Sequence, residues 1–142
     1  MNKEEIKFYT AGILDTCGKI TLRKDGKSKN SIYPYIEIRS EKDTNLKMIQ
    51  SNLGGTLRQH GNRFILSWTH KKALELIEQI FEYIIVRKEE AEIVKQLYAD
   101  RFTRHYETQR KKEIAKKFIQ LHQSKYGRWK KGNCSLLNWI NE

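Results

Sequence analysis

The chain has 142 residues, a length typical of one domain, and 28 Lys and Arg against 17 Asp and Glu give a formal charge of +11. A hydrophobic content of 38% excludes wholesale disorder, and the strongly basic balance favours a polyanionic partner, most often nucleic acid. No apolar run reaches the roughly 18–20 residues of a membrane span, and the charged start of the chain predicts no signal peptide.

The periodicity of apolar side chains predicts the element order αββαββα, followed by further helices. The predicted segments are, in chain order, a helix at residues 4–16, strands at 19–24 and 32–40, a helix starting after Asp43, hairpin strands at 56–59 and 63–69, and helices near 71–85, 88–100 and 106–122. The expected boundary signals are Gly18 as the stop of the first helix, a turn at Asp25-Gly26, Asp43 as an N-cap and Gly54-Gly55 as a stop. The fold class is therefore α+β with an antiparallel sheet.

Each predicted strand has one apolar face and one polar, mostly basic face. This is typical of an antiparallel sheet that helices cover on one side. The polar face is either simply solvated or a binding surface for the major groove of DNA, where Arg reads guanine and Lys contributes charge. In the second case the candidate DNA-binding residues are Lys19, Thr21, Arg23, Tyr35, Glu37, Arg39, Arg58, His60, Arg63, Ile65 and Ser67.

The positive charge is concentrated at the end of the chain. Residues 101–142 hold eleven basic and three acidic side chains, which is +8 of the total of +11. We therefore divide the chain into a domain at 1–100 and a basic helical extension at 101–142. Phosphate contacts are expected from Arg110, Lys111, Lys112, Arg128 and Lys130, with a solvated helix face as the alternative.

Two cysteines, Cys17 and Cys134, predict neither a disulfide framework nor a zinc site, and the four histidines show no metal-ligand spacing. This cysteine usage favours a reducing, intracellular setting in cytoplasm, nucleoid or organelle, and not secretion.

Three segments are similar to the LAGLIDADG homing endonucleases. Residues 9–18, YTAGILDTCG, resemble the motif that names this family. Residues 53–58, LGGTLR, are similar to the family's entry into its second hairpin, and residues 83–92, YIIVRKEEAE, resemble a third family segment. The resemblance covers about residues 5–100 and implies the family's αββαββα fold with a DNA-binding antiparallel sheet.

The single copy of the motif implies a homodimer over a pseudo-palindromic duplex, as in similar enzymes of the family. The dimer interface implied for the first helix comprises Thr10, Ala11, Gly12 and Asp15. Small residues at Ala11 and Gly12 would allow close approach of two helices, and ordinary packing within one chain is the alternative. Asp15 matches an acid of the motif that is mainly structural at the helix end.

The last acid of the family's motif binds the divalent metals that activate water and stabilise the leaving oxygen of a phosphodiester. Cys17 occupies that position here. A thiol is a soft ligand, whereas Mg²⁺ prefers hard oxygen ligands. We therefore assign no metal ligand, and we expect Mg²⁺ or Mn²⁺ as a cofactor only if the protein cleaves.

Three further positions match the catalytic surroundings of the family. Arg87 falls where the family carries a basic residue near the scissile phosphate, with Lys88 beside it. A surface cation at the start of a helix is the alternative for Arg87. Glu41 precedes Lys42 where active relatives often have a Gln-Lys pair that organises water.

These observations leave several functions open. The first is a sequence-specific double-stranded DNA-binding protein whose cleavage is lost or impaired, and which acts as a regulator or remains from a mobile element. The second is an active, metal-dependent homing endonuclease that makes double-strand cuts. A maturase-like RNA-binding protein is the third, and a basic structural protein without a specific site is the fourth.

Overall fold

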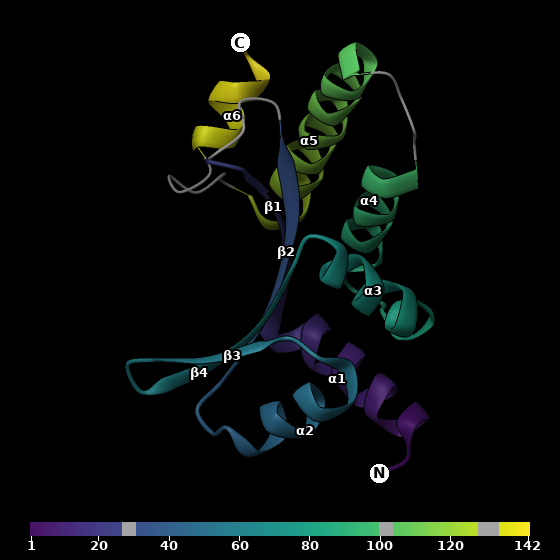
Figure 1. Cartoon of the computed structure of the whole chain (residues 1–142), viewed down its shortest axis with the longest axis vertical. Coiled ribbons are helices and arrows are strands. Elements are labelled where there is room, and N and C mark those ends of the chain that lie inside the picture. The colour runs from purple at the N-terminus through teal and green to yellow at the C-terminus, as the bar shows by residue number, and fades with distance from the viewer. Residues whose placement is uncertain (27–30, 100–103, 128–133) are drawn as a thin grey trace.

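The computed structural model describes residues 1–26, 31–99, 104–127 and 134–142 (Figure 1). Its elements are α1 (Lys3–Cys17), β1 (Gly18–Lys24), β2 (Ile32–Ser40), α2 (Thr44–Leu53), β3 (Thr56–His60), β4 (Arg63–Thr69), α3 (Lys71–Ile80), the 3₁₀ helix η1 (Phe81–Tyr83), α4 (Lys88–Ala99), α5 (Arg104–Tyr126) and α6 (Cys134–Ile140). The predicted α+β class and the order αββαββα with C-terminal helices are confirmed. Within the described ranges, no helix is both long and apolar enough to span a bilayer.

The four strands form one antiparallel sheet in the order β1-β2-β4-β3. The inner strand β2 pairs with β1 on one side and with β4 on the other, so its residues take part in both ladders. Figure 1 shows that the sheet bends strongly along its length. The β3–β4 hairpin projects away from the helices at one end, and β1 and β2 run toward α5 and α6 at the other.

The main core lies between the apolar face of the sheet and helices α1 to α4. One row across the sheet, Ile20–Ile36–Trp68, shows the expected alternation, because all three side chains are buried. Trp68 also donates its indole N–H to the Leu53 carbonyl at the end of α2, at 3.2 Å. That bond satisfies the one polar group of a large apolar side chain in the core.

A second core lies at the far end of β1 and β2. Its buried members come from the two strands, from α4 and from both C-terminal helices: Leu22, Ile32, Ile93, Ile114, Ala115, Phe118, Ile119, Leu136 and Trp139. The C-terminal helices therefore bury apolar surface against the sheet.

Glycines mark two close approaches at the predicted boundaries. Gly18 has an extended backbone, with φ of −111°, so it begins β1 directly and is no left-handed stop. A Cβ at Gly18 would lie 2.8 Å from the Glu37 carbonyl oxygen. At Gly55 the chain takes φ of +102°, and a Cβ there would lie 2.8 Å from the Trp68 ring. Both positions therefore exclude a side chain.

Two local predictions are wrong. The third helix ends at Ile80, five residues before its predicted end, and a 3₁₀ turn follows. The chain turns there because Ile84 enters the core and the next amides bond to Asp15. Asp43 precedes α2 as expected, but its side chain makes no capping bond and instead pairs with Lys47 at 2.7 Å.

Candidate nucleic-acid interface

The strand register places all eleven candidate residues of the sheet on the same face. Lys19 pairs with Glu37, which pairs with Ser67, and this alternation continues along the ladders. Arg39 pairs with Ile65, which pairs with Arg58. The same register adds three residues that the sequence analysis did not single out: Tyr33, Thr56 and Thr69.

Glu37 is the centre of an ion-pair cluster on this face. Its carboxylate is only 2% exposed and binds Lys19 Nζ through Oε1 at 3.0 Å and Arg39 Nε through Oε2 at 2.7 Å. Burial alone would raise the pKa of Glu37, but the hydrogen bonds and charges of Arg39 and Lys19 outweigh it and hold the pKa below its ordinary value. Lys19 and Arg39 themselves stay about half exposed.

A second cluster surrounds Tyr35. The Arg23 guanidinium lies 3.5 Å from the centroid of the Tyr35 ring, and Arg58 donates to the Tyr35 hydroxyl at 3.2 Å. Guanidinium groups stack favourably on aromatic faces while keeping their donors available at the edge. Two of the long cationic side chains that cover this face, Arg23 and Arg58, therefore contact the same tyrosine.

This arrangement corrects the predicted roles of three residues. Tyr35, Glu37 and Ile65 were expected to reach DNA directly, yet all three are buried. Glu37 and Tyr35 instead hold the cations of the face in place, and Ile65 lies between Arg39 and Arg58 in the strand register. Their strand alternation was predicted correctly, but alternation alone does not tell which side chain of a face is covered by its longer neighbours.

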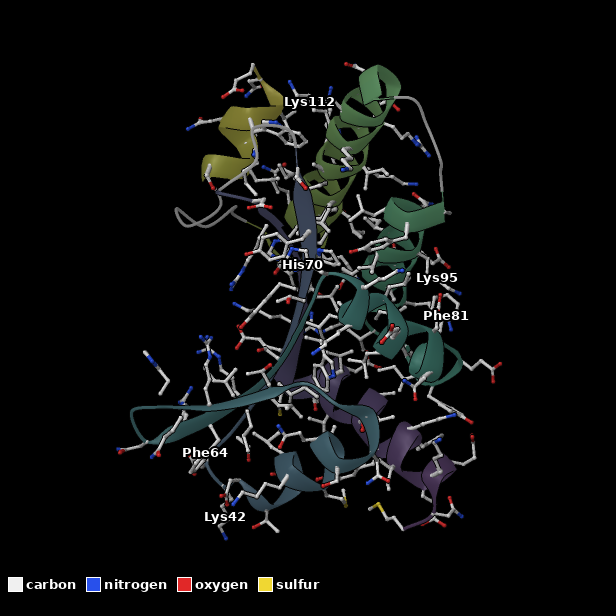
Figure 2. All side chains as sticks on the ribbon, in the orientation of Figure 1. Lys42, Phe64, His70, Phe81, Lys95 and Lys112 are labelled. Carbon is white, nitrogen blue, oxygen red and sulfur yellow. The ribbon has the colours of Figure 1, made fainter. Side chains whose placement is uncertain are left out.

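An aromatic pair lies beside the Tyr35 cluster. The rings of Tyr33 and His70 stack at 4.4 Å with an angle of 9° between them. His70 adopts φ of +56°, which is rare for a residue with a side chain. Figure 2 shows His70 at the middle of the long axis, where β4 leads into α3. Alternation in β2 could have predicted Tyr33, but no sequence signal marks the backbone of His70.

Cys17 is exposed at the end of α1, between two hollows. The larger has a volume of about 950 Å³ and lies between α1, α2 and the chain after β2. Its polar and charged lining includes Arg39, Glu41, Lys42 and Arg63. The smaller, of about 240 Å³, is lined by Cys17, Gly18, Lys19, Glu37 and Arg39. The structure thus places Glu41 and Cys17 in the lining of one hollow.

Arg87 is bound to protein acceptors and is not free for a phosphate. Its Nε donates to the Leu14 carbonyl at 2.9 Å, its Nη1 donates to the Tyr126 hydroxyl at 2.8 Å, and the side chain is 15% exposed. Asp15 accepts hydrogen bonds from the amides of Ile85 and Arg87 at 2.8 and 3.1 Å. Arg87 therefore joins α1 to α4 and α5, and Asp15 holds the turn before α4.

Glu90 anchors this network from α4. It is almost fully buried, and it accepts hydrogen bonds from Lys125 Nζ at 2.7 Å and from the Tyr126 hydroxyl at 3.1 Å. Burial would lower the pKa of Lys125, but its hydrogen bond and ion pair with Glu90 raise it above the ordinary value. A buried acid on α4 was not predicted, because the run Lys88-Glu89-Glu90 reads as an exposed helix start.

Lys88 lies away from the basic face. Its ammonium group bonds to the Phe81 carbonyl and sits 3.9 Å from the centroid of the Phe81 ring. Figure 2 shows Phe81 on the opposite side of the molecule from the β3–β4 hairpin. The expectation that Lys88 substitutes for Arg87 near a phosphate therefore does not fit its position.

Of the residues predicted for a dimer interface on the first helix, only some are exposed. Thr10 and Ala11 are buried within the single chain, and Thr10 donates its hydroxyl to the Ile6 carbonyl at 2.7 Å. Ala11 therefore packs within the single chain, which was the alternative to a dimer contact. Gly12 is exposed with open space around it. Phe8 on the same helix is 67% exposed, and the nearby loop adds Ile85 at 81% and Val86 at 51%.

The candidate residues of the extension fall in two groups. On α5, Arg110 pairs with Glu113 at 3.2 Å, and Lys112 lies 5.5 Å from the centroid of the Trp139 ring of α6. Figure 2 shows Lys112 at the end of the molecule where α5 faces α6. Lys111, on the same turn, is half-buried. Arg128 and Lys130 lie outside the described residues.

Comparison with known proteins connects this arrangement to one class of fold. No family model matches the chain, and no curated protein matches it. The homing endonuclease I-CvuI, solved in complex with the I-CreI target, superposes with a TM-score of 0.75 at 14% identity, over 99% of this chain and 97% of that one. The archaeal intron-encoded homing endonuclease I-Vdi141I, complexed with DNA, gives 0.70 at 16% identity, with the same two coverages.

A longer protein matches at half its length. The LAGLIDADG meganuclease I-CpaMI, bound to uncleaved DNA, gives a TM-score of 0.62 at 20% identity over 95% of this chain but 49% of that one. The chain therefore has the fold of the LAGLIDADG homing endonucleases. The resemblance found in the sequence is confirmed at the level of the fold, and nearly the whole chain, including the C-terminal helices, takes part in it.

Proposed function

We propose that this chain is a sequence-specific double-stranded DNA-binding protein, a homodimer on the LAGLIDADG scaffold whose cleavage is lost or impaired. The observation that carries the proposal is the single face of the sheet on which five cations gather: Lys19, Arg23, Arg39, Arg58 and Arg63. The acid on that face, Glu37, is already paired with two of them. The surface therefore offers a strong net positive charge to a polyanion.

The chemistry of the face suits the major groove of a duplex. Arginine donates two parallel hydrogen bonds to the acceptor edge of guanine, and a two-stranded ribbon fits the width of that groove. Arg23 and Arg58 are already oriented by the ring and the hydroxyl of Tyr35, which lowers the entropy lost on binding. The neighbours I-CvuI and I-Vdi141I were solved with DNA, which supports a duplex as the ligand here.

A second copy of the chain is the expected partner. Phe8, Gly12, Ile85 and Val86 give α1 and the adjoining loop an exposed apolar surface, which is unusual in a monomer. The match to half of I-CpaMI supports the idea that two copies do what one longer chain does there. A two-fold dimer would read a pseudo-palindromic site.

The residue at the end of α1 argues against normal cleavage. Cys17 stands where the family's metal-binding acid is expected, and its sulfur does not replace a hard carboxylate oxygen for Mg²⁺. Glu41 shares the larger hollow with Cys17, but it is one carboxylate beside the cations Arg39, Lys42 and Arg63. Arg87, expected near the scissile phosphate, is bound to Tyr126 and to the Leu14 carbonyl.

One selection tests the proposal. The purified protein is mixed with a random duplex library in Mg²⁺ at moderate salt, and the shifted and the cut DNA are sequenced separately. We expect a shifted, uncut pool with a pseudo-palindromic motif. On the selected site, Cys17→Asp is expected to gain Mg²⁺-dependent double-strand cleavage, with Cys17→Ser as the neutral control.

Other outcomes identify the other functions. A cut pool from the wild-type protein would establish an active, metal-dependent endonuclease and contradict our reading of Cys17. Tighter binding of a structured RNA than of any selected duplex, at matched salt, would establish a maturase-like role. An absence of enriched sequences would leave a basic protein without a specific site.

A further inference from the structure

The surface around Cys17 is cationic. Among the residues that line its two hollows, the charged side chains are four basic and two acidic ones: Lys19, Arg39, Lys42, Arg63, Glu37 and Glu41. Both oxygens of Glu37 are bound by Lys19 and Arg39, so this carboxylate is not available to another cation. An incoming ion at Cys17 therefore meets an excess of positive charge.

This donor set does not fit a divalent metal. Among the residues that the structure describes, no three His, Cys, Asp or Glu side chains are grouped so that they could hold a metal ion. A hard cation such as Mg²⁺ or Ca²⁺ requires oxygen ligands, and Cys17 offers sulfur. The ammonium of Lys19 and the guanidinium of Arg39 would also repel a dication in the same hollow.

The same residues fit a phosphate. Lys19 uses one of its three donors on Glu37, and Arg39 uses its Nε, so within the described chain the two terminal nitrogens of Arg39 bond to no protein atom. A guanidinium with both terminal nitrogens available binds phosphate oxygens in a bidentate manner. Because Glu37 is buried and binds both cations, Lys19 and Arg39 are held beside the hollow before any ligand arrives.

We propose that Lys19 and Arg39, held by Glu37, form a phosphate site beside Cys17 that neutralises the DNA backbone in place of a divalent metal. The inference rests on the proposed DNA-binding function and adds to it that duplex binding requires no Mg²⁺ or Ca²⁺. The site is made within one chain, from the start of β1 and the end of β2. It lies where a metal-dependent relative would have an acid and a metal together.

Binding measurements with and without a divalent cation test this inference. The affinity of the full-length protein for its selected duplex is measured by fluorescence anisotropy in EDTA and in Ca²⁺, at one ionic strength. The wild-type dissociation constant is expected to agree between the two conditions within about twofold. Calcium titrated into the preformed complex in a calorimeter is expected to give no binding heat.

Cys17→Asp is the informative variant, and Cys17→Ser is its uncharged control. The new carboxylate would face the DNA backbone, so binding in EDTA is expected to weaken by about tenfold and to recover in Ca²⁺. The serine variant is expected to behave as the wild type. Lys19→Met and Arg39→Met are each expected to reduce the salt dependence, log K against log salt, by about 0.9.

The outcomes separate this inference from the proposed function. A wild-type protein that loses tenfold or more of its affinity in EDTA would overturn the inference while leaving DNA binding intact. An aspartate variant that binds equally well in both conditions would overturn it too. Failure of the wild-type protein to bind any duplex in either condition would overturn the proposed function, and the inference with it.

Discussion

The carboxylate of Glu37 determines how the basic face is arranged. It is buried on the inner strand β2 and bound through both oxygens, so Lys19 and Arg39 are held by the same carboxylate. A buried charge is tolerated only when it is paired and hydrogen-bonded, and removal of one partner leaves the others unsatisfied. Glu37 therefore affects both the stability of the chain and the position of its cations.

Glu37→Gln is expected to lower the free energy of unfolding at pH 7 by about 1–2 kcal/mol, since each charged hydrogen bond contributes modestly and both cations are half exposed to solvent. Urea unfolding at pH 7 measures the loss. Glu41→Gln is the control, because it removes the same charge from an exposed side chain just after β2. It is expected to change the free energy of unfolding little.

The pH dependence has a definite sign. The folded state holds the pKa of Glu37 below its ordinary value of 4.5, so its ion pairs stabilise the fold fully above that pH. This contribution is lost as the pH falls from 4.5 through the folded pKa. The stability difference between wild type and Glu37→Gln is therefore expected to shrink in urea titrations below pH 4.5. A difference that stays the same from pH 7 to below pH 4.5 would show that folding does not lower the pKa of Glu37.

At the scale of elements, the C-terminal helices stabilise the far end of β1 and β2. Leu136 and Trp139 of α6 pack with Leu22 and Ile32 of the two strands in the second core. This cluster has no member in α2, β3 or β4, which belong to the main core. The two cores therefore share the sheet and α4, whereas α1 to α3 contribute only to the main core and α5 and α6 only to the second.

Trp139→Ala is expected to lower the free energy of unfolding by about 3–5 kcal/mol, because it removes a buried aromatic ring from the second core. Hydrogen exchange is the measurement of choice, because it reports the protection of each helix and strand separately. Protection is expected to fall in α5 and in β1 while it is largely kept in β3 and β4. Leu137→Ala, on the exposed side of the same helix, is the control. A uniform loss of protection would indicate that the two cores unfold as one cooperative unit.

The order of the elements could be read from the sequence, because strand alternation and the glycine signals are local. Gly54-Gly55 illustrates this, since the predicted stop falls between α2 and β3, but the close approach of Gly55 to the Trp68 ring was not predicted. For the site, the sequence predicted which strand residues share a face of the sheet but not which side chains contact one another. Arg87 reads as a free cation, yet its partners Tyr126 and Leu14 are distant in sequence, and no local pattern reveals such bonds. The burial of Glu90 could not be predicted for the same reason.

At the scale of the whole molecule, we expect the exposed face of α1 to form the dimer and the basic face of the sheet to bind DNA. The first carries apolar surface and a glycine, and the second carries cations. A two-fold axis along α1 would bring two hairpins to one side of the dimer, which doubles the surface presented to a duplex. The affinity for a full pseudo-palindromic site would then depend on the dimer, and the affinity for a half-site would not.

Gly12→Leu separates these two contributions. Among the residues that the structure describes, nothing lies within 4 Å of a Cβ at Gly12. Replacing a glycine inside a helix stabilises it by up to about 1 kcal/mol, so the monomer is expected to fold at least as well. The leucine side chain would, however, hold two α1 helices apart. Sedimentation velocity is expected to show the mass of one 17.0 kDa chain for the variant and of two for the wild type.

Ser51→Leu adds the same side chain to an exposed position of a different helix, α2, and is expected to stay dimeric. Gly12→Leu is also expected to bind the full site no more tightly than a half-site, because it loses the second set of contacts. A Gly12→Leu protein that still sediments as a dimer and protects the full site would place the dimer interface elsewhere. The basic face would then have to bind DNA in an arrangement that does not depend on α1, and the pseudo-palindrome expected from the two-fold axis would lose its basis.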